Sequence, residues 1–350
     1  MKRNVLLMAV SVFVLHSYGQ TIDMATNAPR CGDSYVVRQM EYFAQGDEGK
    51  NVLWDFSELK SLDKKSRREY FLSRDSIVTG VDEECARKYE LTGDSLRCLG
   101  YDTRLKHMEY SEPMTMMTYP FGYGYSITNT YHGKGDYCKR LLLKNGGTLM
   151  VEADAEGSIV YNEGDTLKNV LRVHTTRLNS VSLHAQTDTL MEDTSRMKQE
   201  IEEHYAWYVR GYRYPMYETS SITFYDNMTP VSCIQKAYHY CADDMSEMSD
   251  SVNEEILAAD SIANVAEQDI IHYTIKNDGY NLTMDYSLDA DAGINALISS
   301  SRGMLHGRKS AKQPAGRDYQ LTFDIVSLPQ GEYVLYINVN DKVYNEKFRK

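Results

Sequence analysis

The chain has 350 residues, of which 42% are hydrophobic and 25% charged, and its 50 acidic and 38 basic residues give a net charge of −12 at pH 7. This acidic balance argues against nucleic acid and anionic membrane surfaces as partners, because both attract clustered lysine and arginine. The length allows two or three domains, each with a core of its own.

The first nineteen residues have the pattern of a secretory signal peptide. Two basic residues precede the apolar run 5–15, and small residues at Ser17 and Gly19 precede a cleavage point before Gln20. The run is too short to span a bilayer and no later segment reaches about 18 apolar residues, so we expect cleavage and no membrane insertion. Cleavage leaves a net charge of −14, since two basic residues and no acidic ones are lost. The expected location is extracellular or at the cell surface, with the periplasm as the alternative.

Residues 20–241 have the composition of a β-rich region. Short runs rich in β-branched and aromatic residues are separated by Gly, Asp and Asn turn signals. The 28 tyrosines, with many valines, threonines and isoleucines, favour strands over helices. We therefore expect an all-β fold with a β-sandwich-like N-terminal region.

One segment, 187–208, fits two structures. Ile201 and Tyr205 are four residues apart, as on one face of a helix, while Tyr205 and Trp207 alternate as in a strand. We expect a short polar helix or loop that becomes a strand from about His204.

The segment 242–269 separates two regions of strand pattern. It holds nine acidic residues and neither a basic nor an aromatic one. Such a segment buries little apolar area, so it is expected to be an acidic linker or an exposed helix. Alternation resumes at Ile270 and runs to Lys350, which predicts an Ig-like C-terminal β-sandwich over 270–350.

The cysteines permit disulfides in an exported chain. There are six, at Cys31, Cys85, Cys98, Cys138, Cys233 and Cys241. Cys85 and Cys98 flank a turn and are the best local pair, whereas Cys233 and Cys241 would lie roughly 26 Å apart if one strand joins them. The chain has no CxxC pair or His-rich spacing, and the acidic loop 289–293 lacks ligands of the EF-hand form, so we expect neither a metal site nor a cofactor.

The C-terminal region carries a recognisable ending. The turn Leu328-Pro329-Gln330-Gly331-Glu332-Tyr333 joins two alternating runs, and the chain closes on Lys347-Phe348-Arg349-Lys350. This ending resembles the C-terminal sorting domain of Bacteroidetes proteins exported by the type IX (Por) secretion system. The resemblance implies an outer-membrane export machinery as partner and makes Leu328, Pro329, Gly331 and Tyr333 the sorting-like motif.

The N-terminal region also carries short motifs spread along its length. They are Pro29-Arg30-Cys31-Gly32-Asp33, residues 49–57, Tyr119-Pro120-Phe121-Gly122, residues 154–159, Asn169-Val170-Leu171-Arg172-Val173, Trp207-Tyr208 and Tyr212-Arg213-Tyr214-Pro215. Together they resemble a group of uncharacterised Bacteroidetes proteins that bear such sorting domains, and the resemblance implies no activity. Physically, the Gly and Pro residues set turns while Trp54, Trp207 and the tyrosines fill sheets.

Six Asp-(Ser/Thr)-aliphatic tripeptides resemble the O-glycosylation acceptor of exported Bacteroides proteins. Two lie in the acidic segment and make Ser251 and Ser261 candidate acceptors. The alternative is ordinary turn chemistry, in which Asp and Ser side chains bond the nearby backbone.

A possible catalytic triad is weaker. Gly93-Asp94-Ser95-Leu96 spells the GDSL esterase signature, and Asp269 and His272 have that family's Asp-x-x-His form. A Ser nucleophile with Asp and His would be a hydrolase triad. However, Ser95 follows a long β pattern rather than the first strand of an α/β sheet, and Asp269 opens a different module.

The function we expect is non-catalytic: an exported β-protein for binding or structure, with a glycan or a protein as ligand. The alternative is a secreted hydrolase, either carbohydrate-active or a GDSL-type esterase. Exposed tyrosines on a β-sheet suit a glycan, although tyrosine more often fills a sheet than binds a sugar.

Overall fold

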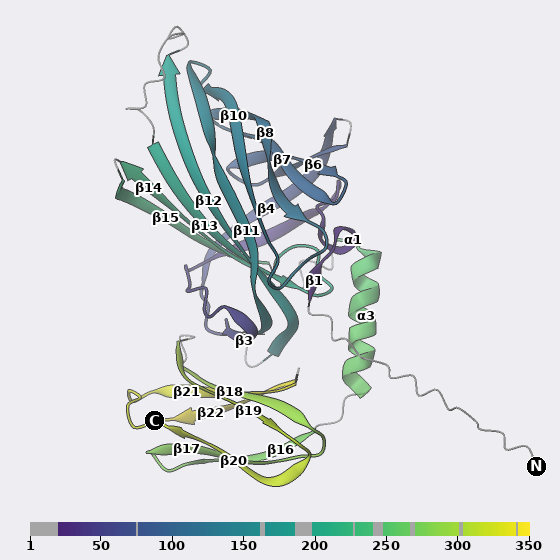
Figure 1. Ribbon diagram of the computed structural model, residues 1–350, viewed down its shortest axis with the longest axis vertical. Coiled ribbons are helices and arrows are strands. Elements are labelled where there is room, and N and C mark those ends of the chain that lie inside the picture. The colour runs from purple at the N-terminus through teal and green to yellow at the C-terminus, as the bar shows by residue number, and fades with distance from the viewer. Residues whose placement is uncertain are drawn as a thin grey trace, which may run out of the picture.

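The computed structural model describes residues 20–74, 76–161, 165–185, 198–226, 228–240, 248–266, 270–300, 304–340 and 342–350. Strands dominate these residues, and the helices are α1 (Met24–Asn27) and α3 (Ser251–Ala266). The expected all-β class is confirmed. Figure 1 shows a tall barrel, a smaller pair of sheets beneath it, and α3 beside the junction.

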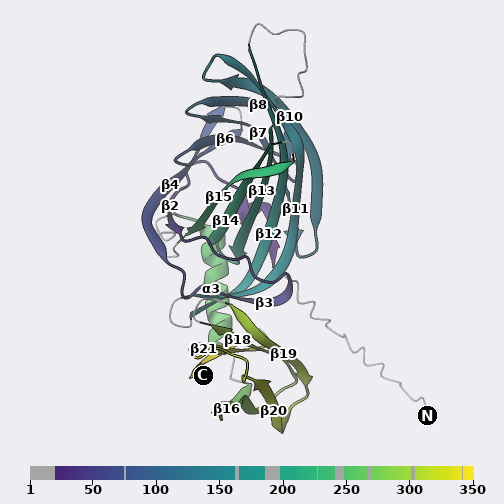
Figure 2. The same cartoon turned by 90° about the vertical axis from the view of Figure 1, so that its left-hand side faces the viewer.

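The N-terminal region is a closed antiparallel barrel. Its twelve strands follow the order β10-β8-β7-β6-β5-β4-β2-β15-β14-β13-β12-β11, and β10 pairs with β11 to close the ring. In chain order these strands are β2 (Ser34–Met40), β4 (Ser61–Arg74), β5 (Ile77–Val81), β6 (Cys85–Thr92), β7 (Ser95–Thr103), β8 (Lys106–Thr118), β10 (Ser126–Tyr137), β11 (Leu141–Tyr161), β12 (Asp165–Ala185), β13 (Lys198–Val209), β14 (Tyr217–Asp226) and β15 (Thr229–His239). Figure 2 views the barrel from the side of β14 and β15.

This single rolled sheet replaces the two-sheet sandwich expected for residues 20–241. The reason is strand length: β11 and β12 each run for 21 residues, and their pairing contains two register shifts. Long twisted strands with bulges curl until the edges meet. Gly147, a residue type that signals turns in sequence, lies inside β11 because a Cβ there would come within 1.8 Å of the Leu178 carbonyl oxygen.

Three short strands complete this half of the molecule. β3 (Gly49–Asp55) is the parallel neighbour of residues 155–160 of β11, beyond the part of β11 that pairs with β10. β1 (Thr21–Ile22) pairs with β9 (Phe121–Gly122) as a separate two-stranded sheet. Ile22 and Phe121 are both buried in the cluster that fills one end of the barrel interior.

Two apolar clusters hold the barrel. The inner one gathers residues from opposite walls, with Cys98, Met108 and Leu143 among its members. The second packs Trp54 and Phe56 against Trp207 where β3 covers the barrel. Burying these large side chains supplies most of the stabilisation, at about 25 cal/mol for each Å² of apolar surface.

The C-terminal region is a pair of facing sheets. One has the order β16-β17-β20 and the other β19-β18-β21-β22. The strands are β16 (Ile271–Asn277), β17 (Asn281–Leu288), β18 (Ala292–Ser300), β19 (Leu305–Gln313), β20 (Gly316–Asp324), β21 (Glu332–Val339) and β22 (Lys342–Arg349). Leu282 and Phe323 from one sheet share a buried core with Ile298 and Leu335 from the other.

The barrel and the C-terminal sheets touch directly. Leu297 and Tyr336 form a buried cluster with Val160, the last residue of β11 that pairs with β3. The Tyr336 hydroxyl donates to Asp55 Oδ2 at 2.6 Å, and a second hydrogen bond joins β18 to the carbonyl of residue 51. Among the described helices, none is long and apolar enough to cross a membrane.

The ambiguous segment resolves in part. Lys198–Val209 is strand β13, beginning six residues before the expected start, and residues 186–197 lie outside the described part of the chain. The strand forms because β12 and β14 pair with it on both sides, which overrides its polar composition.

The expected disulfides are not seen among the described residues. Cys31, Cys85, Cys98, Cys138 and Cys233 are all free, and Cys241 lies outside the described ranges. The local pair fails because of register: Cys85 is opposite Thr103, whereas Cys98 is opposite Tyr89.

Candidate functional site

The inner wall of the barrel carries polar side chains from β8, β10, β11, β12 and β13. The register sets them in three cross-strand rows: Tyr110, Gly133 and Asn145; then Tyr131, Gly147, Asn179 and Glu200; then Leu149, Arg177 and Glu202. Alternation puts them on the same face as the buried Leu143 and Leu149, so they point into the barrel. We call these polar side chains, together with the neighbouring Tyr101, the interior cluster. Its members are Tyr101, Tyr110, Tyr131, Asn145, Arg177, Asn179, Glu200 and Glu202.

An ion pair lies within the interior cluster. Arg177 Nη2 is 2.6 Å from Glu202 Oε2. Arg177 lowers the pKa of the Glu202 carboxyl against the opposing effect of burial, and Arg87 on the facing wall adds to the lowering. The Arg177 and Glu202 side chains retain 22% and 24% of their exposure although they point inward. The ion pair is thus partly, not completely, enclosed by its neighbours inside the barrel.

A chain of hydrogen bonds crosses the second row. The Tyr131 hydroxyl donates to Asn179 Oδ1 at 2.9 Å, and Asn179 Nδ2 donates to Glu200 Oε2 at 2.8 Å. Burial raises the pKa of Tyr131 to about 12, so the phenol stays protonated and donates at neutral pH. This chain holds the Asn179 amide in one orientation.

Three buried polar atoms of the interior cluster have no hydrogen-bond partner among the described residues. They are the Tyr110 hydroxyl, Asn145 Oδ1 and Arg177 Nε. Tyr110 and Asn145 are each only 6% exposed. A buried polar atom left unpaired costs about 1–3 kcal/mol, so such atoms are normally satisfied by a protein group, water or ligand. The interior cluster thus combines an ion pair with buried polar atoms that the described side chains leave unpaired.

A second group of charged side chains links strands β4, β13 and β14 of the barrel. Arg68 of β4 forms an ion pair with Glu218 of β14, and His204 Nε2 lies 3.3 Å from Glu218 Oε1. Burial opposes ionisation of Glu218, but Arg68 and His204 outweigh it and lower the pKa of the carboxyl to about 2. Arg68, Glu218 and His204 interact with one another, so they hold β4, β13 and β14 together rather than offer a free binding group.

The seam between β15 and β2 is the weakest in the barrel. Only residues 237–239 of β15 pair with β2, and in the described structure 229–236 pair with β14 alone. Lys236 Nζ bridges the gap by donating to both carboxylate oxygens of Glu84 at 2.8 Å. This ion pair supplements the short run of backbone pairing at the seam.

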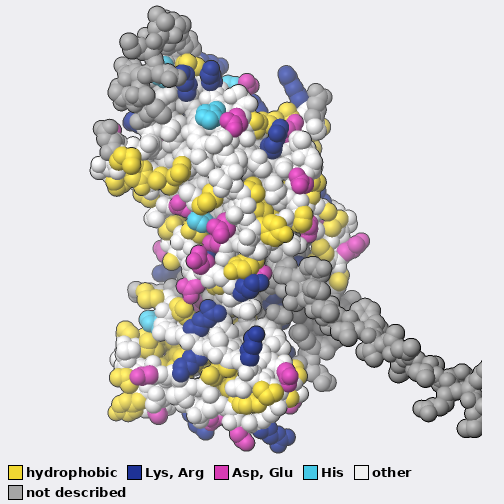
Figure 3. Space-filling model, viewed as in Figure 1, with side chains coloured by type: hydrophobic (Ala, Val, Ile, Leu, Met, Phe, Trp, Pro, Cys, Tyr) yellow, Lys and Arg dark blue, Asp and Glu magenta, His cyan; other side chains and the backbone are white. Residues whose placement is uncertain are grey.

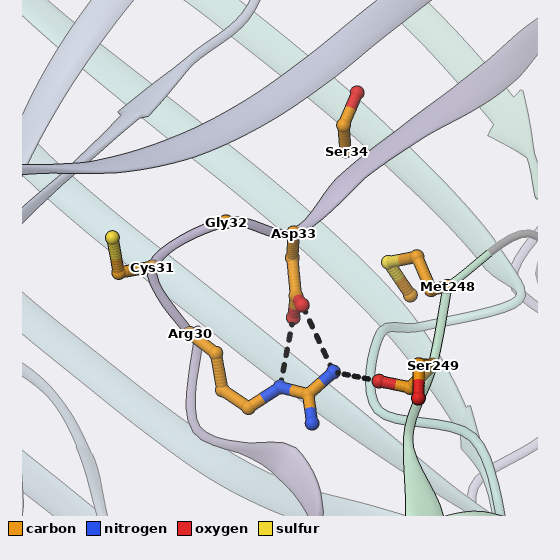
Figure 4. Close-up of a pocket in the computed structure, with 7 residues that line it drawn as sticks. All are labelled: Arg30, Cys31, Gly32, Asp33, Ser34, Met248 and Ser249. Atoms are coloured by element: carbon orange, nitrogen blue, oxygen red, sulfur yellow. Dashed lines mark hydrogen bonds and ion pairs between the residues drawn. The ribbon is translucent and has the colours of Figure 1, made fainter.

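A separate cavity of about 470 Å³ lies on the surface where α3 meets the barrel (Figure 4). Arg30 lines it and pairs with Asp33 at 2.9 Å, while its guanidinium also donates to the Ser249 carbonyl. Behind it, the buried Arg213 holds Asp250 at 2.7 Å. These described charges are paired with one another, so the cluster anchors α3, and the exposed free thiol of Cys31 lies at the edge of the cavity.

A second cavity, of about 430 Å³, lies between the barrel loop 55–58 and strands β21 and β22. Its walls carry Glu58 on one side and Lys347 and Arg349 on the other. Figure 3 shows acidic side chains over the lower barrel face and basic ones over the sheets below it. Opposite charge on the two walls suits contact between the two parts of the chain.

The structure does not bring the candidate triad together. Ser95 opens β7 in the barrel, where its hydroxyl donates to Asp94 Oδ1 at 3.0 Å. His272 lies in β16 of the C-terminal sheets beside Asp289, and Asp269 lies outside the described residues. Ser95 is thus in a hairpin turn, as its Gly-Asp neighbours favour.

The other predicted residues include exposed and buried positions, and Tyr333 of the sorting-like motif is only 4% exposed. Ser251 and Ser261 are exposed on α3, and the Ser261 hydroxyl donates to the Leu257 carbonyl. In the sorting-like motif the Tyr333 hydroxyl donates to the Pro329 carbonyl at 2.9 Å. Gly331, in the same turn, exchanges backbone hydrogen bonds with the final residue, which ties the turn to the C-terminus.

Two sets of sequence motifs meet in space. Pro29–Asp33 and Tyr212–Pro215 supply the Arg30 and Arg213 ion pairs at the α3 junction. The interior cluster, in contrast, was missed. Its signal was the alternation of Glu200, Glu202 and His204, which are two residues apart and share one strand face.

Among the described residues, no group of three or more His, Cys, Asp or Glu side chains is placed to hold a metal ion. No family model and no curated protein matches the chain. Six chains of solved structures match, among them dimeric latent PorU from Porphyromonas gingivalis, a distant neighbour at 10% identity and a TM-score of 0.20. That match covers 91% of this chain and 33% of PorU, so this chain spans about a third of the neighbour's length.

Proposed function

We propose that the chain is an exported, non-catalytic binding protein that takes a small polar ligand into its barrel. The observation that carries the proposal is the polar interior cluster, in which buried atoms on Tyr110, Asn145 and Arg177 have no partner among the described residues, beside the Arg177–Glu202 ion pair. The hydrolase alternative has no comparable support, because Ser95 and His272 lie on different sheets.

Export is the second part of the proposal. It is supported by the signal-peptide pattern of residues 1–19 and by the resemblance of the sorting-like motif to type IX export signals. Intact mass of the native protein from culture medium and cell surface tests it. A chain that begins at Gln20 is expected. A chain that still begins at Met1, or that stays in the cytoplasm, would contradict export.

Binding is tested by ligand-observed NMR and thermal shift on the purified full chain after signal-peptide removal. The probes are a panel of neutral sugars, sugar acids, amino acids and dipeptides. We expect at least one class to bind and to raise the melting temperature, while nitrophenyl esters and glycosides are not hydrolysed. Binding by no class, or hydrolysis that Ser95→Ala abolishes, would overturn the proposal.

A further inference from the structure

We propose that the cavity of about 430 Å³ between the barrel and the C-terminal sheets binds a small zwitterion, a free amino acid or a dipeptide with an apolar side chain. This cavity is separate from the interior cluster, so the inference does not depend on the ligand proposed for the barrel. It follows from three properties of the cavity: exposed charges without partners, walls of opposite polarity, and apolar surface between them.

The wall formed by β21 and β22 presents cations. Lys347 and Arg349 are two residues apart on β22, so they lie on the same face of the strand, and both are exposed and line the cavity. Neither side chain has an ion pair or a hydrogen bond among the described residues. Glu332 lies opposite Arg349 in the strand register. Two cations and one anion give this wall a net charge of +1, which matches one carboxylate better than a doubly charged phosphate.

The wall formed by the barrel loop presents acceptors. The Ser57 hydroxyl donates to Asp55 Oδ1 at 2.6 Å, so its hydrogen is engaged while its oxygen can still accept. Tyr336 donates to the other oxygen of Asp55, which fixes this carboxylate in place. Glu58, the next residue along the loop, is exposed, and its side chain has no ion pair or hydrogen bond among the described residues. This wall therefore suits a positively charged donor such as an ammonium group.

A ligand that carries one charge of each sign meets both walls at once. A pure anion would be repelled by the acidic loop, and a pure cation by the two basic side chains of β22. Between the walls, the half-buried Val334 and Phe348 supply apolar surface, and the Phe348 ring is stacked on Tyr333 with centroids 5.6 Å apart. Sites for small molecules have volumes of about 300–1,000 Å³, so the cavity has room for an amino acid or a dipeptide.

The probes are leucine and glycylleucine, tested on the full chain after signal-peptide removal. Two blocked forms of leucine separate the charges: N-acetylleucine keeps the carboxylate without the ammonium group, and leucinamide keeps the ammonium group without the carboxylate. Saturation-transfer NMR at up to about 50 mM detects dissociation constants in the millimolar range. We expect both zwitterions to bind and each blocked form to bind about tenfold more weakly than leucine, because one charge-assisted contact is lost.

Lys347→Gln and Glu58→Gln each remove one charge from an exposed side chain, so the fold should be kept while affinity for leucine falls about tenfold. Lys312→Gln and Glu109→Gln are the matched controls, since both residues are exposed and neither lines the cavity. Weaker binding in both cavity variants and in neither control supports the inference. Binding of neither zwitterion, blocked forms that bind as tightly as leucine, or unchanged affinity in either cavity variant overturns it. Zwitterion binding that survives both cavity variants would place the ligand elsewhere and leave the proposed function standing.

Discussion

At the scale of single residues, the most constrained side chain is Arg172, which is only 2% exposed. Its guanidinium makes two 2.9 Å hydrogen bonds to the Asp154 carboxylate and also donates to the Gln45 carbonyl. It lies 5.7 Å from the Trp54 ring and 5.9 Å from the Trp207 ring. One side chain therefore ties β12 to β11, to β3 and to the loop between β2 and β3.

Replacing Arg172 with Ala should cost about 3–5 kcal/mol of unfolding free energy, because it leaves the Asp154 charge buried without a partner. Urea denaturation followed by tryptophan fluorescence measures the change. Arg210→Ala is the control, since Arg210 is 46% exposed and its ion pair with Asp260 should contribute less than about 1 kcal/mol. Equal costs for the two variants would contradict the role of the buried pair.

Glu218 should make stability depend on pH in acid. Its pKa is lowered from 4.5 to about 2, so its ion pair stabilises the fold fully above pH 4.5 and the contribution is lost as the pH falls toward 2. The shift corresponds to about 3 kcal/mol. Glu218→Gln should flatten the fall in unfolding free energy between pH 5 and pH 2, whereas Glu109→Gln, at a side chain 73% exposed, should keep it. An unchanged slope in Glu218→Gln would refute this assignment.

At the scale of elements, α3 is fixed to the barrel through its first turn. Asp250 accepts from Arg213 Nε at 2.7 Å and from Asn253 Nδ2 at 2.8 Å, while its carbonyl accepts from the Glu254 amide. Because one carboxylate both pairs with a buried arginine and holds the helix start, it sets the position of the whole helix.

Asp250→Ala should release α3. We expect faster amide hydrogen exchange along 251–261 and a loss of about 3 kcal/mol of unfolding free energy, because the buried Arg213 would keep only Asp33, 4.0 Å from its Nε, as a counter-charge. Asp260→Ala, which removes only the exposed pair with Arg210, should leave exchange near the helix start unchanged. Slow exchange in the Asp250→Ala protein would show that other contacts hold the helix.

The elements also show what sequence patterns can and cannot predict. The all-β class, the strands after Ile270 and the turn at Gly93 and Asp94 follow from alternation and turn chemistry, which are local. The closed barrel does not, because closure depends on the pairing of β10 with β11 and of β15 with β2, the second between segments about 200 residues apart. The interior cluster was missed for the same reason, since Glu200 and Glu202 read as exposed charges until β12 and β14 enclose their strand.

At the scale of the whole molecule, the barrel and the C-terminal sheets are joined through a small buried contact. Leu297 is 5% exposed and packs with Val160 and Tyr336 at the junction. The hydrogen bond from Tyr336 to Asp55 lies beside it, and burial with the field of Asp55 raises the pKa of the Tyr336 phenol so that it remains a donor. An apolar centre with a polar bond beside it is the form of a specific interface.

Leu297→Asp should separate the two parts without unfolding either, because a carboxylate at the junction must be hydrated and an open interface supplies the water. Small-angle scattering should show a larger radius of gyration, while the far-ultraviolet circular dichroism of the strands is retained. Val326→Asp is the matched control, since Val326 is 58% exposed on the C-terminal sheets and should leave the radius unchanged. A compact Leu297→Asp protein would mean that the remaining contacts, including those of Asn295 and Tyr336, are enough to hold the junction closed.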